Sequence, residues 1–392
     1  MQPHSDLRRG AKQWATLVMI AIFTLPCWAK RITVAQLEKT LQVDAARHKQ
    51  PEDIVRQLGG IELTERLAEP DLRRLQSPFA GTSVAEALRL VADESAFLEP
   101  PANEIPTTAA PDVAAQQRML AAARTYMLKT LARLPNFMAT QATRQYDDSP
   151  WAMKKNEWPM RAGLHLVDSS TREISIRDEG ESHLPSQASA MWRDQAGLIS
   201  GGEFGASLGM ILTDISKGKV SWSHWETKTQ GTEAVFAYAV PQTASHFAVI
   251  TALRRQPQSE MTSVADGGGR GVQGIGARPG AGVATETLDR SEAAYHGSLW
   301  IDPATGTILR ITIDADLKSA ALQRAAILVQ YAPVTIGGST FICPVRSLAL
   351  SVAVPDARNL EGTAPTEWLN VTEYTDYHRF GSSVRVLPGK PQ

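Results

Sequence analysis

The chain has 392 residues, 43% of them hydrophobic, with a formal net charge of −1 at pH 7 and two cysteines. This length predicts two or three domains. The near balance of acidic and basic residues gives no electrostatic indication of nucleic acid or an anionic membrane as a partner, and we expect neither.

Residues 1–29 have the layout of a secretory signal peptide. Three basic residues precede an uncharged apolar run at 14–26, and the small residue Ala29 ends the segment. The run has 13 residues, fewer than the roughly 18 that a membrane-spanning helix needs. We therefore predict export to the periplasm, cleavage after Ala29 and no transmembrane segment in the mature protein. An uncleaved N-terminal anchor remains the alternative.

Cleavage would change both the charge and the cysteine content. The signal segment holds three basic residues and one acidic residue, so its removal changes the formal charge from −1 to −3. It also removes one of the two cysteines and leaves Cys343. Because a single thiol cannot form an internal disulfide, we expect burial of apolar residues to stabilise the mature protein.

Residues 30–110 predict a small helical region. Thr33 and Gln36 have the spacing of a capping box at the start of one amphipathic segment. Ser83 and Glu86 repeat that spacing before a later segment with helical periodicity. Four prolines between positions 100 and 111 then interrupt the pattern. Proline density of this kind marks a linker, so we place a domain boundary there.

A longer helix is predicted over 112–134, where apolar residues keep helical spacing until Pro135. Beyond it, apolar and polar residues alternate with a period of two, which predicts strands. The stretches "DPATG" (302–306) and "IGGST" (336–340) predict turns between successive strands. Hairpins in succession predict an antiparallel sheet with one buried face.

Residues 256–293 are rich in glycine and have no apolar periodicity. They predict a disordered insertion or a long loop between strands. The G-x-G-x-x-G match at 269–274 lacks the strand before it and the helix after it that a dinucleotide site requires. The histidines are scattered, with no metal-ligand spacing. We therefore expect no cofactor and no metal.

The stretch Gly205–Gly209 matches G-x-S-x-G, the pattern of the nucleophile elbow in α/β-hydrolases. An elbow needs an apolar strand before the turn, whereas glycines interrupt the residues that precede this one. Phe204, Leu208 and Ile211 instead keep the spacing of one helix face. We predict a short covering helix at 204–214, no catalytic residue and no enzymatic activity. A serine esterase at Ser207 is the less favoured alternative.

Three stretches carry a resemblance to known proteins: "LARLPNFMATQATRQY" (131–146), "YHGSLWIDPATGTILRITIDAD" (295–316) and "VQYAPVTIGGSTFICPVRSLAL" (329–350). Together they resemble a widespread group of exported bacterial proteins, and the second also resembles the periplasmic lipoprotein-carrier (LolA-like) superfamily. The resemblance covers about residues 112–255 and 291–380. It implies an α+β fold: a curved antiparallel β half-barrel with helices covering its concave face and an apolar cavity between them. It supplies no catalytic residue.

The expected organisation is a signal peptide at 1–29, a helical region at 30–110, a LolA-like α+β domain at 111–380 and a tail at 381–392. The expected function is that of an envelope protein that binds an apolar ligand, such as an acyl chain or a lipoprotein. The alternative is an interaction or stress-sensing module whose helical region docks an envelope protein. The predicted ligand-lining residues are Trp222, Phe236, Tyr238, Leu299, Ile301, Leu309, Ile311, Leu348 and Leu350.

Overall fold

The structure is a computed structural model that describes residues 30–131, 134–148, 163–177, 180–182, 198, 203–228, 231–254, 286–319, 322–354 and 365–379. The predicted signal peptide and the predicted tail lie outside the described residues. Among the helices that the structure describes, none is long and apolar enough to cross a membrane.

The N-terminal unit, residues 30–104, has a hydrophobic core of its own, built mainly from leucines. Its elements are β1 (Lys30–Ile32), α1 (Val34–Ala46), α2 (Pro51–Leu58), β2 (Ile61–Leu63), α3 (Glu69–Gln76), η1 (Ser77–Phe79), α4 (Ser83–Ser95) and η2 (Ala102–Glu104). The predicted capping box at Thr33 and Gln36 is confirmed. The prediction of a capping box at Ser83 and Glu86 is wrong. Ser83 is already helical, and the N-cap residue Thr82 makes no side-chain capping hydrogen bond. The short parallel pairing of β1 with β2 was not predicted.

Most of the remaining chain forms one open sheet of ten antiparallel strands, in the order β5-β4-β3-β14-β13-β12-β11-β10-β7-β6. The end strands β5 and β6 do not pair with each other, so the sheet is an open half-barrel, and the predicted α+β fold class is confirmed. The strands are β3 (Phe137–Asp147), β4 (His165–Arg177), β5 (Gly180–Ser182), β6 (Lys219–Lys228), β7 (Gly231–Val240), β10 (Ala294–Ile301), β11 (Ile308–Asp316), β12 (Leu322–Ile336), β13 (Ser339–Ala353) and β14 (Thr366–Arg379).

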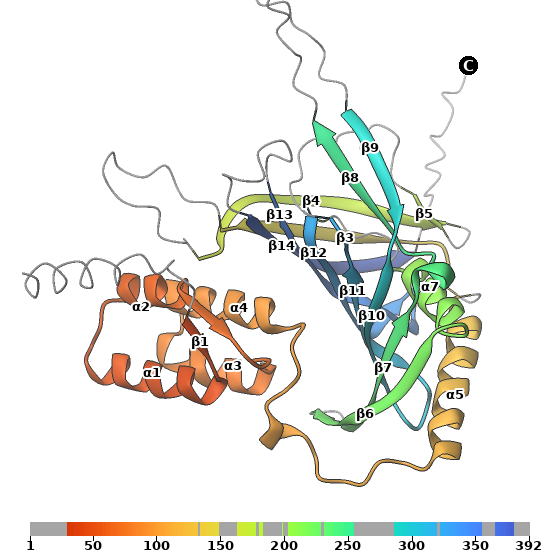
Figure 1. Ribbon diagram of the computed structural model, residues 1–392, viewed down its shortest axis with the longest axis horizontal. Helices are drawn as coiled ribbons and strands as arrows, with labels where there is room; N and C mark the ends of the chain where they lie inside the picture. The colour runs from red at the N-terminus through yellow and green to blue at the C-terminus, as the bar shows by residue number, and fades with distance from the viewer. Residues whose placement is uncertain are drawn as a thin grey trace, which may run out of the picture.

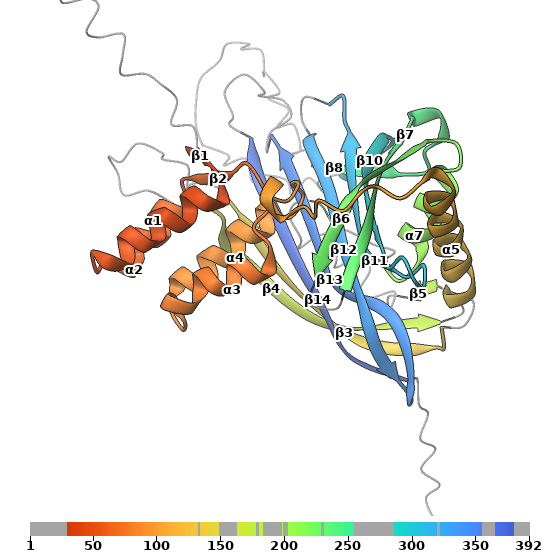
Figure 2. The ribbon, with the colours of Figure 1, turned by 90° about the horizontal axis from the view of Figure 1, so that it is seen from below.

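The sheet is covered on both sides, as Figures 1 and 2 show. Helices α5 (Val113–Leu131) and α7 (Ala206–Asp214) pack against the face that we call the inner face. The N-terminal unit packs against the opposite, outer face through Leu90, Ala96 and Phe97. The expectation of a single buried face is therefore wrong. Two-sided burial explains why Ala325–Val329 of β12 is apolar without alternation, since side chains on both faces of this strand are buried.

A separate two-stranded hairpin joins β8 (Ala248–Arg254) to β9 (Glu286–Glu292). The glycine-rich segment was predicted to be without strands over 256–293, and this is wrong for 286–292. Polar residues dominate that stretch, and only its pairing with β8 makes it a strand. Most of the predicted insertion lies outside the described residues. The short helix η3 (Gln242–Ala244) precedes β8.

The predicted covering helices are both present, as α5 and α7. The turn predicted at "DPATG" connects β10 to β11, where the Asp302 carboxylate accepts hydrogen bonds from the Ala304 N–H (2.8 Å) and the Thr305 hydroxyl (2.8 Å). Gly306 in this turn has a φ of 76°, a region that favours glycine. A Cβ atom at this position would lie 2.5 Å from the Ala122 carbonyl carbon, so glycine also permits α5 to approach the turn.

Candidate functional site

Five of the predicted lining residues meet on the inner face. Phe236, Tyr238, Leu299, Ile301 and Ile311 are almost completely buried, and they share one hydrophobic cluster with α5 and α7. Trp222 packs against the same cluster from β6 and forms an edge-to-face contact with Phe236. These side chains are packed core beside the pocket described below, and none of them lines it.

Leu348 and Leu350 correct the prediction of one shared face. They lie on the outer face, in the cluster that Leu90, Ala96 and Phe97 of the N-terminal unit cover. The alternation along β13 predicts that these two leucines share one face, but alternation alone does not say which side of a strand faces the helices. On β13 the inner side carries Ser347 and Ser351, because these residues pair across to Val329 and Ala325.

Leu309 is also displaced from its predicted position. The register of β10 and β11 shifts, so that Trp300 pairs with Arg310 while Ile301 pairs with Ile308. Leu309 falls in this irregularity, is only half-buried and joins none of the hydrophobic clusters among the described residues. Ile308 takes the inner-face position instead. A bulge of this kind changes which side chain points inward, and no local sequence pattern predicts this bulge.

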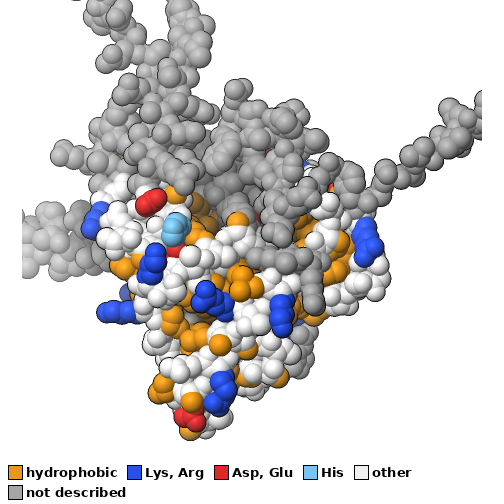
Figure 3. Space-filling view, turned by 90° about the vertical axis from the view of Figure 1, so that its right-hand side faces the viewer, with side chains coloured by type: hydrophobic (Ala, Val, Ile, Leu, Met, Phe, Trp, Pro, Cys, Tyr) orange, Lys and Arg blue, Asp and Glu red, His pale blue; other side chains and the backbone are white. Residues whose placement is uncertain are grey.

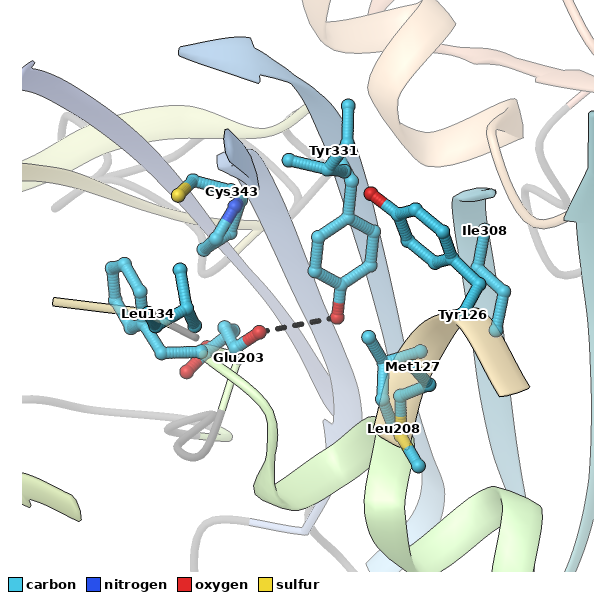
Figure 4. A pocket seen from close by; sticks show the side chains of 11 residues that line it. Tyr126, Met127, Leu134, Glu203, Leu208, Ile308, Tyr331 and Cys343 are labelled. Atoms are coloured by element: carbon cyan, nitrogen blue, oxygen red, sulfur yellow. Dashed lines mark hydrogen bonds between the residues drawn. The ribbon is translucent and has the colours of Figure 1, made fainter. Parts of the chain in front are cut away.

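The best-defined apolar pocket lies between α5, α7 and strands β11 to β13 (Figure 4). Nearly all its lining side chains are apolar or aromatic: Tyr126, Met127, Leu134, Phe204, Leu208, Ile308, Tyr331, Ile342, Cys343 and Pro344, together with Glu203. Its free volume is about 30 Å³, close to the space of one water molecule. Pockets that enclose small molecules usually measure roughly 300–1,000 Å³. As the helices lie here, the pocket is nearly closed.

Burial keeps two polar groups of the pocket, the Tyr331 phenol and the Cys343 thiol, in their protonated forms. The Tyr331 hydroxyl donates a 3.1 Å hydrogen bond to the Glu203 carbonyl oxygen, drawn as a dashed line in Figure 4. Burial raises the pKa of this phenol well above its ordinary value. Burial also raises the pKa of the Cys343 thiol to about 12. Cys343 is therefore protonated at neutral pH, and we expect its thiol to react slowly.

Helix α5 is a lightly anchored cover for this pocket. Within the described part of the helix, three side chains are buried against the inner face: Met119, Ala123 and Met127. Leu128 and Val113 stay exposed. Met is unbranched and adapts to irregular surfaces, so two of the three anchors are side chains that tolerate repacking. Figure 3 shows the face of the molecule that includes α5, with apolar side chains between Lys and Arg.

On the outer face, a buried ionic cluster attaches the N-terminal unit to the sheet. Arg66 donates a 2.6 Å hydrogen bond to Glu226, and both residues are less than 10% exposed. The Trp300 indole N–H donates to the same carboxylate at 2.7 Å, and Lys228 also bonds it. Arg310 stacks over Trp300 at 4.4 Å from the ring centroid and donates to the Ala96 carbonyl oxygen.

These charges act on one another strongly. Burial by itself would raise the pKa of Glu226, but the His224 ring and the charges of Arg66 and Lys228 hold it well below the usual range. Burial and the neighbouring Arg66 charge lower the pKa of Arg310. The Glu226 carboxylate is therefore ionised at neutral pH, and it compensates the charge of the buried Arg66 that it bonds. This makes the cluster a structural attachment between the two parts of the chain.

A wide polar groove remains between the N-terminal unit and the outer face. It has a volume of about 850 Å³ and is bordered by α3, α4 and strands β3, β12, β13 and β14. Three ion pairs lie along it: Arg89 with Glu69, Arg144 with Glu373, and Arg346 with Asp93. Acidic and basic side chains alternate, so the groove offers no single sign of charge for steering a ligand.

The structure gives Ser207 no nucleophile-elbow geometry. Ser207 lies in the first turn of α7 with ordinary negative φ, and the unusual backbone angle belongs to Gly205, whose φ is 143°. An elbow places the serine itself on the strained turn. Among the described residues, no group of three or more His, Cys, Asp or Glu side chains is arranged to hold a metal ion.

The fold and site define an open antiparallel half-barrel with a helix-covered apolar pocket and a docked N-terminal helical unit. Comparisons with protein-family models, with curated proteins and with solved structures gave no significant match. The pocket residues were not among the predicted lining residues. Of the pocket residues, Leu208 is the one whose position the sequence indicates, because its helical spacing places it on the side of α7 that covers the sheet.

Proposed function

We propose that this protein is an exported envelope protein that binds an apolar chain, such as an acyl chain, between the inner face of the sheet and helix α5. The observation that carries the proposal is the pocket of apolar and aromatic side chains beneath a helix anchored by few residues. Each methylene group of a ligand buried there would contribute about 0.8 kcal/mol. No step of covalent chemistry is part of this function.

Ligand entry requires α5 to move outward. The free space of about 30 Å³ does not admit an acyl chain, whereas displacement of Met119 and Met127 would join the pocket to the apolar cluster behind it. Helix α5 also carries Arg118, Arg124 and Lys129 and no acidic residue. Its exposed side therefore favours a ligand with an anionic head group, such as a fatty acid.

The test is uptake of oleate by delipidated protein comprising residues 30–392, measured by native mass spectrometry and by the reaction of Cys343 with a thiol reagent. We expect a one-to-one complex. We also expect the thiol to react slowly without ligand and at least about fivefold more slowly with it, because the ligand would cover a buried thiol of raised pKa.

The matched variants are Ile308→Trp, which fills the pocket, and Leu128→Trp, which adds the same indole to an exposed position of α5. Ile308→Trp should lower oleate affinity at least about tenfold while Leu128→Trp leaves it unchanged. Absence of any complex with oleate or phospholipid, or equal effects of the two variants, would contradict the proposal.

A second candidate is an interaction module that uses the N-terminal unit. The observation that favours it is the groove of about 850 Å³ between this unit and the outer face, which is large enough for side chains of a protein partner. Crosslinking in cells with and without residues 30–104 tests it. The captured proteins should change when the unit is removed, and an unchanged set would exclude this role.

A further inference from the structure

The exposed side of α5 carries positive charge that no acidic residue of the helix balances. Arg118, Arg124 and Lys129 are exposed, and we call them the α5 cations. The helix itself contains no aspartate or glutamate. The acidic residue just before it, Asp112, caps the helix, because its carboxylate accepts a 2.6 Å hydrogen bond from the Ala115 N–H. The α5 cations therefore have no counter-ion within their own helix.

The α5 cations also find no partner on neighbouring elements, since none of them forms an ion pair with a described residue. Other exposed arginines of this protein do pair, such as Arg56 with Asp53 and Arg89 with Glu69. Figure 3 shows several Lys and Arg side chains on the face that includes α5, and few Asp or Glu side chains among the described residues. This face is therefore basic, with charges that stay available to a partner.

An apolar line runs along the same exposed side of α5. Ala114, Ala121 and Leu128 each lie about two turns after the one before, which places them on one line of an α-helix. All three are exposed, and the exposed fraction of Leu128 is 59%. On the helical wheel, two of the α5 cations lie on one side of this apolar line and the third, Arg124, lies on the other. The exposed side thus combines a narrow apolar line with positive charge on both flanks.

We propose that the exposed side of α5 docks on the surface of an anionic phospholipid bilayer. The α5 cations would lie near the lipid phosphates, which attract lysine and arginine, while the apolar line contacts the interface between head groups and acyl chains. The apolar line favours a lipid surface over a nucleic acid, whose backbone offers only charge. The near-balanced charge of the whole chain predicts no such partner, because net charge does not show where on the surface the charges lie.

The test is flotation of protein comprising residues 30–392 with vesicles of phosphatidylcholine alone, or of phosphatidylcholine and phosphatidylglycerol in equal parts. Residues 1–29 are omitted because a basic and apolar segment of this kind would bind vesicles by itself. We expect binding to the vesicles that contain phosphatidylglycerol and not to the others. This binding should weaken at least about tenfold when NaCl is raised from roughly 50 mM to roughly 300 mM, because salt screens such attractions.

A variant with Arg118→Gln, Arg124→Gln and Lys129→Gln should bind these vesicles at least about thirtyfold more weakly, since each cation near an anionic surface contributes roughly fivefold. The matched control makes the same change of charge at three exposed cations of the N-terminal unit that form no ion pair with a described residue: Lys39→Gln, Arg47→Gln and Arg73→Gln. The control should bind as the unaltered protein does. Both variants should fold, because every changed side chain is exposed.

A dye on the apolar line reports whether this side of α5 touches the lipid. The fluorophore NBD, attached to Leu128→Cys, should brighten at least about twofold on vesicles with phosphatidylglycerol. Attached to Val43→Cys, an exposed apolar position of α1, it should not. Cys343 is buried and should label slowly.

Equal binding to the two kinds of vesicle overturns the proposal, as does equal weakening by the two charge variants. So does the absence of vesicle binding, or a dye that brightens at position 43 and not at 128. The pocket lies on the buried side of α5, so docking does not depend on acyl-chain binding. Oleate uptake, measured on the same samples, reports separately on that pocket.

Discussion

At the scale of single residues, the Arg66–Glu226 pair decides how firmly the N-terminal unit is held. Glu226→Gln would leave Arg66 buried without the carboxylate that it bonds, and removing one partner of a buried pair costs about 3–5 kcal/mol. We expect a loss of that size in the free energy of unfolding, measured by urea denaturation. The exposed pair Arg144–Glu373 is the control, and Glu373→Gln should cost less than about 1 kcal/mol.

The same pair also affects how the stability of the folded protein falls at acid pH. The pKa of Glu226 is lower in the folded protein than in the unfolded chain. Its contribution to stability is therefore complete above the unfolded pKa of about 4.3 and is lost as the pH falls through the folded pKa. In Glu226→Gln protein, the decline of stability below pH 4 should be shallower. Parallel acid curves for the two proteins would show that Glu226 does not contribute as described.

At the scale of elements, substitutions in α7 distinguish a helix that covers the sheet from an esterase motif. Ile211 is fully buried against the sheet, so Ile211→Ala should cost roughly 2–5 kcal/mol. Ser207→Ala removes one hydroxyl on the first helical turn and should change stability by less than about 1 kcal/mol. Differential scanning calorimetry of both variants measures this. Covalent labelling of Ser207 by a fluorophosphonate in folded but not denatured protein would instead establish a nucleophile.

At the scale of the whole molecule, the N-terminal unit covers apolar residues of the outer face that would otherwise meet water. Leu328, Leu348, Leu350, Leu369 and Val371 form this surface. A protein lacking residues 30–104 should therefore bind the dye ANS strongly and self-associate, because large exposed apolar patches promote association. Size-exclusion chromatography and dye fluorescence measure this effect.

The control for that deletion is a shortened protein that also carries Leu348→Thr and Leu350→Thr. These changes introduce a β-branched residue, which suits a strand, and remove apolar surface. Dye binding and association should fall toward the levels of the full-length protein. A shortened protein that stays monomeric and does not bind ANS would mean that the outer face needs no cover.

Local sequence determined several elements of this protein. The covering helices at 113–131 and 206–214, the Thr33 capping box, the turn at 302–306 and the succession of antiparallel strands all follow from patterns within a few residues. These features depend on periodicity and turn chemistry, which are local properties. The α+β class follows from their order along the chain.

Tertiary structure alone decided which face each strand presents and what covers it. Leu348 and Leu350 alternate correctly but point outward, because pairing with β12 and β14 sets the register. The bulge at Trp300 and Ile301 replaced Leu309 with Ile308 on the inner face. The pocket and the Arg66–Glu226 pair each join residues more than 100 positions apart. Contacts between such distant residues depend on register and packing across the whole sheet, which no local pattern encodes.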